Sequence, residues 1–354
     1  YQMPKEEIYI PVQVGAEGQR EYFIAMIPLG LLSKLFQNEE EYILPEYRAQ
    51  RGINEARIPE IRDYILNNKN TYVFSALSAS IDGTFEFHPS EIDDNAGILE
   101  GDMGAVLLIN DGQHRKAAIE AALIEAPELA KETISIVLFK DEGLKRSQQM
   151  FADLNKHAVK STMSLSTLYD YRDDLANAVK EVVFQIPFLN KYIDKEKDNL
   201  GKNSSKLFTL ANFLRANRRI IRKNEIVDGD KDFLLAYWEE VFSQIKEWRL
   251  LDQKYLCKCT LREEYILTLS VTLQALGRLG HFFYEDKIAI DKLKGLGEID
   301  WLRANGEWVG RAIDNQGKII ASEDAITKIC SLIKQKLNIA LTNEEVAKEN
   351  EVRR

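Results

Sequence analysis

Residues 105–123 read Ala-Val-Leu-Leu-Ile-Asn-Asp-Gly-Gln-His-Arg-Lys-Ala-Ala-Ile-Glu-Ala-Ala-Leu, and this stretch decides the fold of the first part of the chain. Residues 105–110 are apolar and partly β-branched, which is typical of a buried strand. Residues 116–123 are strong helix formers with apolar residues at helical spacing. The sequence therefore predicts a strand that turns tightly into a helix at residues 111–115.

The predicted turn carries the polar side chains of Asp111, Gln113, His114 and Arg115 around Gly112. We expect Asp111 to cap the helix and Gly112 to let the backbone turn sharply. The first N–H groups of a helix have no acceptor within it, and Arg115 can donate two parallel hydrogen bonds to a phosphate. The turn is therefore a candidate phosphate- or nucleotide-binding site, with His114 as a candidate acid–base group. The alternative is an ordinary capped turn with a solvated arginine.

Strands and short helices alternate in the rest of this first part, and the chain becomes mostly helical from residue 145 onward. Strands are expected at 9–14, 21–27, 71–81 and 134–139, and helices at 29–36 and from Pro59. The fold class is α+β, with a mixed sheet in a domain over residues 1–145. A mostly α-helical domain over 146–290 and a C-terminal extension over 291–354 follow.

A predicted helix over residues 206–223 carries five positive charges within nine residues. They are Arg215, Arg218, Arg219, Arg222 and Lys223. Like charges at helical spacing destabilise an isolated helix by a few tenths of a kcal/mol per pair, so something should compensate. The phosphate backbone of duplex DNA would do so, and these residues are the candidate DNA contacts. The alternative is a solvated face whose arginines pair with carboxylates elsewhere in the chain.

Asn155 and Lys156 follow the first domain and form a further candidate. If the second domain folds back over the first, both side chains could close on a phosphate held at residues 112–115, Asn155 through its amide and Lys156 through its charge. The alternative is that these two residues lie at the C-terminus of a helix, where the helix dipole favours the positive charge of Lys156.

The composition limits the classes of protein to consider. The 354 residues have a net charge of −9, which argues against a protein that coats nucleic acid over its whole surface but leaves room for a local basic face. No apolar run approaches the ~20 residues that span a bilayer, and the start lacks a signal peptide, so we expect a cytoplasmic protein without membrane contact. Three cysteines give no disulfide framework, and Cys257-Lys258-Cys259 is too closely spaced for the usual zinc-knuckle pair.

The pentapeptide at 111–115, followed by a helix of small residues, resembles the signature of the DGQHR-domain proteins, and the chain is similar to their DndB family, which is associated with DNA sulfur modification (phosphorothioation). The resemblance continues through residues 151–156, 207–210 and 308–311, so it covers nearly the whole chain. It implies a DNA-binding regulator that represses the phosphorothioation genes by binding double-stranded DNA upstream of its own operon.

The first domain also resembles the ParB/sulfiredoxin superfamily, whose members bind nucleotide phosphates at this turn. Gln113 stands where sulfiredoxins have their catalytic cysteine, so no sulfiredoxin-type activity is expected. The metal-binding Glu of the ParB pattern would fall near Ala152, which leaves the neighbouring Asp153 as the candidate metal ligand and, with His114, as a candidate catalytic residue.

Two other functions stay open. The first is a nucleoside triphosphatase or DNA-nicking effector of a phosphorothioation-linked defence system, with a nucleoside triphosphate and Mg²⁺ as candidate ligands. The second is a scaffold in which the turn is purely structural. The sequence does not decide whether the protein forms a homo-oligomer.

Overall fold

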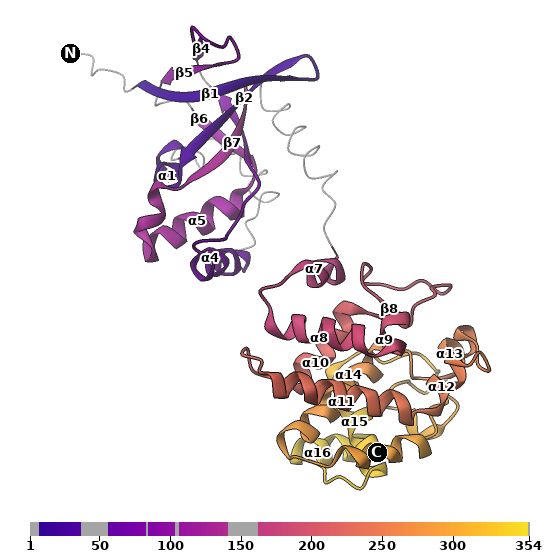
Figure 1. The fold of residues 1–354 in the computed structure, drawn as a ribbon. Helices are drawn as coiled ribbons and strands as arrows, with labels where there is room; N and C mark the ends of the chain where they lie inside the picture. The colour runs from indigo at the N-terminus through magenta and orange to yellow at the C-terminus, as the bar shows by residue number, and fades with distance from the viewer. Residues whose placement is uncertain (1–6, 37–55, 83, 103–105, 141–161, 353–354) are drawn as a thin grey trace. The chain divides into compact units, whose positions relative to one another are not determined.

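The computed structural model describes residues 7–36, 56–82, 84–102, 106–140 and 162–352. The chain divides into two compact units, Tyr1–Val159 and Lys160–Arg354, referred to below as the N-terminal and C-terminal units. Figure 1 shows a sheet with helices in the first and mostly helices in the second. The Asn155, Lys156 and Asp153 candidates lie outside the described residues.

A seven-stranded sheet forms the centre of the N-terminal unit, in the order β4-β5-β1-β2-β7-β3-β6. Its strands are β1 (Glu7–Glu17), β2 (Arg20–Pro28), β3 (Leu77–Asp82), β4 (Phe85–Pro89), β5 (Ala96–Asp102), β6 (Val106–Asp111) and β7 (Thr133–Lys140). Neighbours are antiparallel except β3 and β7, which are parallel. The α+β class with a mixed sheet is thus confirmed, whereas the likeness to ParB and sulfiredoxin stays a prediction.

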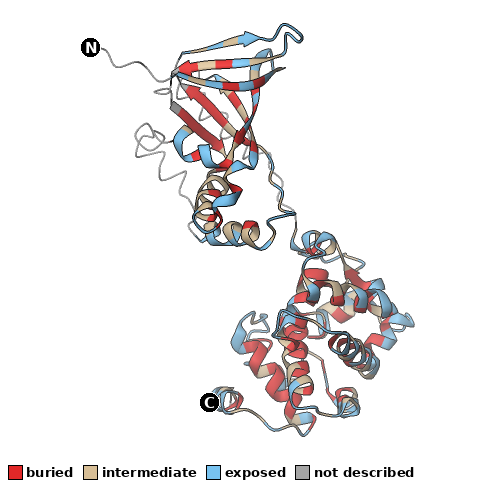
Figure 2. Cartoon of the chain, turned by 60° about the vertical axis from the view of Figure 1, so that its left-hand side comes forward, coloured by how far each residue is buried: buried red, intermediate tan, exposed pale blue. Residues whose placement is uncertain are grey.

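The described residues of this unit also form the helices η1 (Leu29–Leu31), α1 (Leu32–Leu35), α4 (Arg57–Asn67), α5 (Gln113–Glu125) and η2 (Pro127–Lys131). Alternate residues of β7 are buried, as expected for a strand with one face on a core, and α5 buries Ala118, Ile119 and Ala122. Figure 2 shows the buried residues along the strands. Helix α4 packs against α5, which brings Arg57 to the beginning of α5.

The strand expected over 71–81 begins only at Leu77. Residues 71–76 are held by Tyr64 of α4 instead: its hydroxyl accepts a hydrogen bond from the Val73 N–H at 2.9 Å, and its ring lies 5.9 Å from that of Phe74. The aromatic residues whose sequence pattern predicted a strand therefore pack against helix α4.

The C-terminal unit is a bundle of helices around one apolar core. Its helices are α7 (Met163–Tyr169), α8 (Asp174–Gln185), α9 (Pro187–Tyr192), α10 (Leu210–Ile220), α11 (Asp228–Gln244), α12 (Lys246–Asp252), α13 (Lys258–Glu264), α14 (Ser270–Glu285), η3 (Ile290–Glu298), η4 (Gly306–Trp308), α15 (Glu323–Lys336) and α16 (Asn343–Val352). Two short strands, β8 (Ile193–Asp194) and β9 (Phe208–Thr209), pair in parallel.

Helix α10 lies at the centre of this bundle, in close contact with α14. A Cβ atom at Gly277 of α14 would come within 2.4 Å of the Ala216 carbonyl oxygen, so the close approach of the two backbones requires glycine there. Trp238, Trp301 and Trp308 are buried in the same core. In the described part of the chain, every helix is too short or too polar to cross a membrane.

Candidate functional site

The turn between β6 and α5 has the predicted strand–glycine–helix form. Gly112 is the N-cap of α5, with φ +108°, and a Cβ atom there would lie 2.3 Å from Leu77 Cδ2. Both the backbone angle and the space therefore require glycine. The expectation that Asp111 caps the helix is wrong: the N-cap residue is Gly112, and the Asp111 carboxylate accepts a hydrogen bond from Arg115 instead.

Arg115 joins the beginning of α5 to the segment that leads into β3. Its Nη1 donates to the Ser75 carbonyl and hydroxyl oxygens at 2.6 Å each and to the Ala76 carbonyl at 3.1 Å, while its Nη2 donates to Asp111 Oδ2 at 2.9 Å. These acceptors lie together because β3 and β6 are antiparallel, so β3 begins where β6 ends. The guanidinium expected to bind phosphate is thus engaged within the protein.

Gln113 and His114 occupy the first turn of α5. Gln113 Nε2 donates to the Ile109 carbonyl at 3.1 Å, which ties the helix back onto β6. The pKa of His114 is held below its ordinary value mainly by burial, and to a smaller extent by the positive charge of Arg57. Sequence reasoning missed Arg57, because only the packing of α4 on α5 brings it to this site.

The beginning of α5 therefore combines the positive end of a helix dipole, at a glycine N-cap, with a cation from α4. An anion is favoured at such a position by the helix dipole and by the nearby positive charge. Within the described residues, no three His, Cys, Asp or Glu side chains come together as a metal site.

The basic segment in the C-terminal unit differs from the predicted helix over 206–223. Helix α10 ends at Ile220, and Ile221 is extended and buried, so Arg222 and Lys223 lie beyond the helix. Apolar residues of α10 face the core, while Arg215 and Arg218 are exposed.

Three of the five basic residues have carboxylate partners. Arg218 pairs with Asp173, and Lys223 Nζ lies 2.8 Å from Asp230 Oδ2. Arg219 forms a bidentate pair with Glu323, at 2.6 and 2.9 Å, and its Nε donates to Gln274 Oε1 at 2.8 Å. For these three, the structure shows the pairing with carboxylates that the sequence left open.

Arg215 and Arg222 make no ion pair within the described part of the chain. Arg215 Nη1 donates to Asn212 Oδ1 on the preceding turn, at 3.2 Å. The exposed guanidinium of Arg222 follows α10 directly. These two side chains are therefore the readiest to contact an external anion.

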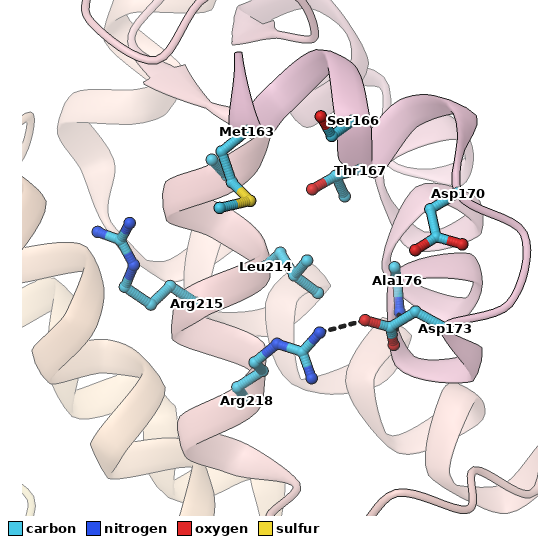
Figure 3. A pocket seen from close by; sticks show the side chains of 10 residues that line it. Met163, Ser166, Thr167, Asp170, Asp173, Ala176, Leu214, Arg215 and Arg218 are labelled. Atoms are coloured by element: carbon cyan, nitrogen blue, oxygen red, sulfur yellow. Dashed lines mark hydrogen bonds and ion pairs between the residues drawn. The ribbon is translucent and has the colours of Figure 1, made fainter. Parts of the chain in front are cut away.

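A pocket of about 410 Å³ lies beside α10, between α7 and the beginning of α8. Met163, Ala176 and Leu214 give it an apolar floor, and Arg215 and Arg218 stand at its edge. Figure 3 shows Arg218 reaching across to Asp173, while the guanidinium of Arg215 points away from that pair. The acidic residues of the pocket make it a poor anion site in itself.

The sequence model of the DndB family, described as DNA-sulfur modification-associated, matches residues 10–340. No curated protein and no solved structure matches the chain.

Proposed function

Because the chain belongs to the DndB family and so takes part in DNA sulfur modification, we propose that it is a DNA-binding regulator that represses the phosphorothioate modification genes. The observation that carries this proposal is the cluster of arginine side chains on the exposed face of α10 and just after its last residue. Arg215 and Arg222 make no ion pair in the described residues, although the charge of Arg215 helps to lower the pKa of Asp198, and Arg218 has a half-exposed one-to-one pair. A protein of net charge −9 that exposes cations together on one element offers a local contact for phosphates.

Arg215 and Arg222 are the first contacts in this proposal. Each can take a phosphate oxygen without giving up an internal ion pair. Arg218, Arg219 and Lys223 contribute only where the DNA phosphate replaces a carboxylate of the protein. Such an exchange yields less free energy than a new contact, because one ion pair is lost for each one gained.

The test is binding of the full chain to a fluorescent duplex from the upstream region of its own operon, over a range of salt concentrations. We expect specific binding whose log K falls with log salt, with a slope that shrinks by ~0.9 for each phosphate contact removed. Arg222→Ala and Arg215→Ala should both lower affinity. Arg249→Ala is the matched control, since Arg249 is an exposed arginine on α12. Equal affinity for a scrambled duplex would remove the repressor role, and equal slopes for all variants would remove these residues as contacts.

We further propose that the beginning of α5 binds a phosphate, either of a nucleotide or of the DNA backbone. The helix N-terminus at Gly112 and the neighbouring Arg57 support this. Adding ATP, GTP or CTP with Mg²⁺ to the duplex titration separates the two sources, since only a nucleotide site makes DNA binding depend on nucleotide. Phosphate release from the nucleotide, without DNA binding, would instead favour the nucleoside triphosphatase or nicking effector.

A further inference from the structure

Two exposed thiols lie next to each other at the beginning of α13, in a part of the C-terminal unit that the proposed function does not use. Cys257 directly precedes the helix and Cys259 is its second residue. The Thr260 N–H donates to Cys257 Sγ at 3.3 Å, and Thr260 Oγ1 lies 3.1 Å from the same sulfur.

These contacts make the two thiols unequal. The hydroxyl and N–H of Thr260 stabilise a thiolate on Cys257 and lower the pKa of its thiol. The pKa of Cys259 is raised, first by its hydrogen bond and charge interaction with Cys257 and then by Glu263. The Cys257 thiol therefore ionises more readily than the Cys259 thiol, and both are open to solvent.

The third cysteine provides an internal comparison. Cys330 is fully buried in the core, and burial raises the pKa of its thiol to about 12. A buried thiol of this kind is inert towards reagents in solvent.

We propose that Cys257 and Cys259 form a peroxide-reactive dithiol, with Cys257 as the attacking sulfur and Cys259 as the resolving one. The inference rests on two exposed cysteines separated by one residue, one of which has its sulfur hydrogen-bonded to both the N–H and the hydroxyl of Thr260. Thiols that are exposed, hydrogen-bonded as thiolates and adjacent to a second cysteine are the ones that hydroperoxides oxidise reversibly.

The chemistry needs only hydrogen peroxide as the oxidant. The Cys257 thiolate attacks one peroxide oxygen, so that an S–O bond forms, the O–O bond breaks and hydroxide leaves, to be neutralised by the proton that the Cys257 thiol released when it ionised. The sulfur of Cys259 then attacks the sulfenic acid. An S–S bond forms, the S–O bond breaks, and the departing hydroxide takes the Cys259 proton and leaves as water. Two thiols are oxidised to a disulfide while one hydrogen peroxide is reduced to two water molecules.

The backbone allows this closure at the level of the Cα atoms. Lys258, the residue between the two cysteines, is helical, so their Cα atoms lie about 5.4 Å apart by helix geometry, within the ~4.4–6.8 Å range of disulfides. Closing the bond draws Cys257 Sγ away from the Thr260 N–H. We therefore expect a disulfide that thiol reductants open readily.

Trypsin makes the product easy to identify, because it cleaves after Lys258, between the two cysteines. The reduced full-length protein is treated with hydrogen peroxide, blocked with iodoacetamide, and digested. We expect residues 255–258 and 259–262 to be recovered joined by a disulfide, which a thiol reductant releases. Cys330 should stay reduced throughout. Peptides that remain separate, or a bond between two chains, would overturn the proposal.

Variants assign the two roles. Cys259→Ser should leave a sulfenic acid on Cys257 that dimedone traps, whereas Cys257→Ser should slow oxidation several-fold. Thr260→Ala should slow alkylation of Cys257 at neutral pH but not at a pH where all thiols are ionised, and Thr260→Ser should restore the rate. Equal reactivity of Cys257 and Cys259 in the native protein, or no effect of Thr260→Ala, would show that these contacts do not activate Cys257.

Discussion

Replacing Arg115 by alanine separates a structural role for the signature turn from a ligand-binding one. The side chain is only 16% exposed and donates four hydrogen bonds. A hydrogen bond from a charged group contributes ~1.5–3 kcal/mol to stability when water cannot reach its acceptor after the donor is removed. Here Ser75 is exposed and water replaces the donor, and the half-exposed pair with Asp111 contributes little. We therefore expect a local loss of about 1–2 kcal/mol.

Hydrogen exchange read by peptide mass is the suitable assay, because all four tryptophans lie beyond residue 237 and report only on the C-terminal unit. A loss of 1–2 kcal/mol accelerates exchange about 5–30-fold in peptides covering β3 and the beginning of α5. Arg115→Lys should fail to rescue it, since one ammonium cannot reach Ala76 and Asp111 together. Lys131→Ala, an exposed charge on η2, is the control. Wild-type exchange in Arg115→Ala, combined with lost DNA or nucleotide binding, would refute the structural role.

Three further predictions follow from single contacts. Glu345→Gln leaves the buried Lys334 ammonium without its 2.7 Å charge partner and should cost about 3–5 kcal/mol in urea unfolding followed by tryptophan fluorescence, whereas a cost below ~1 kcal/mol would contradict this. Gly112→Ala forces an L side chain to φ +108° and should lower the melting temperature measured by circular dichroism; an unchanged value would contradict the strain argument. His114 should titrate below its ordinary pKa by NMR, and Arg57→Ala should raise the midpoint. Because the lowered pKa of His114 makes the folded wild-type protein bind fewer protons than the unfolded one, its stability should fall as the pH drops below ~6.5, the ordinary pKa of histidine. A titration midpoint of His114 at or above that value would contradict this prediction.

Local pattern was sufficient to predict the strand, turn and helix around residues 105–123. The apolar run, the glycine and the alanine-rich segment each favour one local structure, and tertiary packing agrees with all three. The role of Asp111 was not predictable in the same way. Its choice between the N–H groups of α5 and the guanidinium of Arg115 depends on Ser75 and Ala76, which hold that guanidinium in place.

The end of α10 shows a second limit of sequence reasoning. No glycine or proline stops the helix after Ile220, and the basic residues beyond it favour continuation. The chain turns to an extended conformation because Ile221 is buried in the core of the bundle. A tertiary contact thus overrides local propensity, and Arg222 and Lys223 leave the helical face on which spacing had placed them.

Charge patterning showed where cations gather but not how each is neutralised. Asp173 is 45 residues from Arg218, and Glu323 is 104 residues from Arg219, so only the fold could reveal these pairs. Their existence alters the expected binding thermodynamics. An arginine already paired with a carboxylate releases little counterion when it moves to a phosphate, since the carboxylate left behind attracts a cation in turn.

The salt dependence of DNA binding can therefore count the unpaired arginines. If all five basic residues at α10 bound phosphate as new contacts, they would contribute about 4.5 to the slope, whereas Arg215 and Arg222 alone would contribute about 1.8. Arg222→Ala should thus reduce the slope by ~0.9, while Arg218→Ala should lower it far less because its partner Asp173 is freed at the same time. Equal reductions of the slope for the two variants would show that DNA binding breaks the Arg218–Asp173 pair at no electrostatic cost. The intramolecular ion pairs would then not limit the number of phosphates that this surface binds.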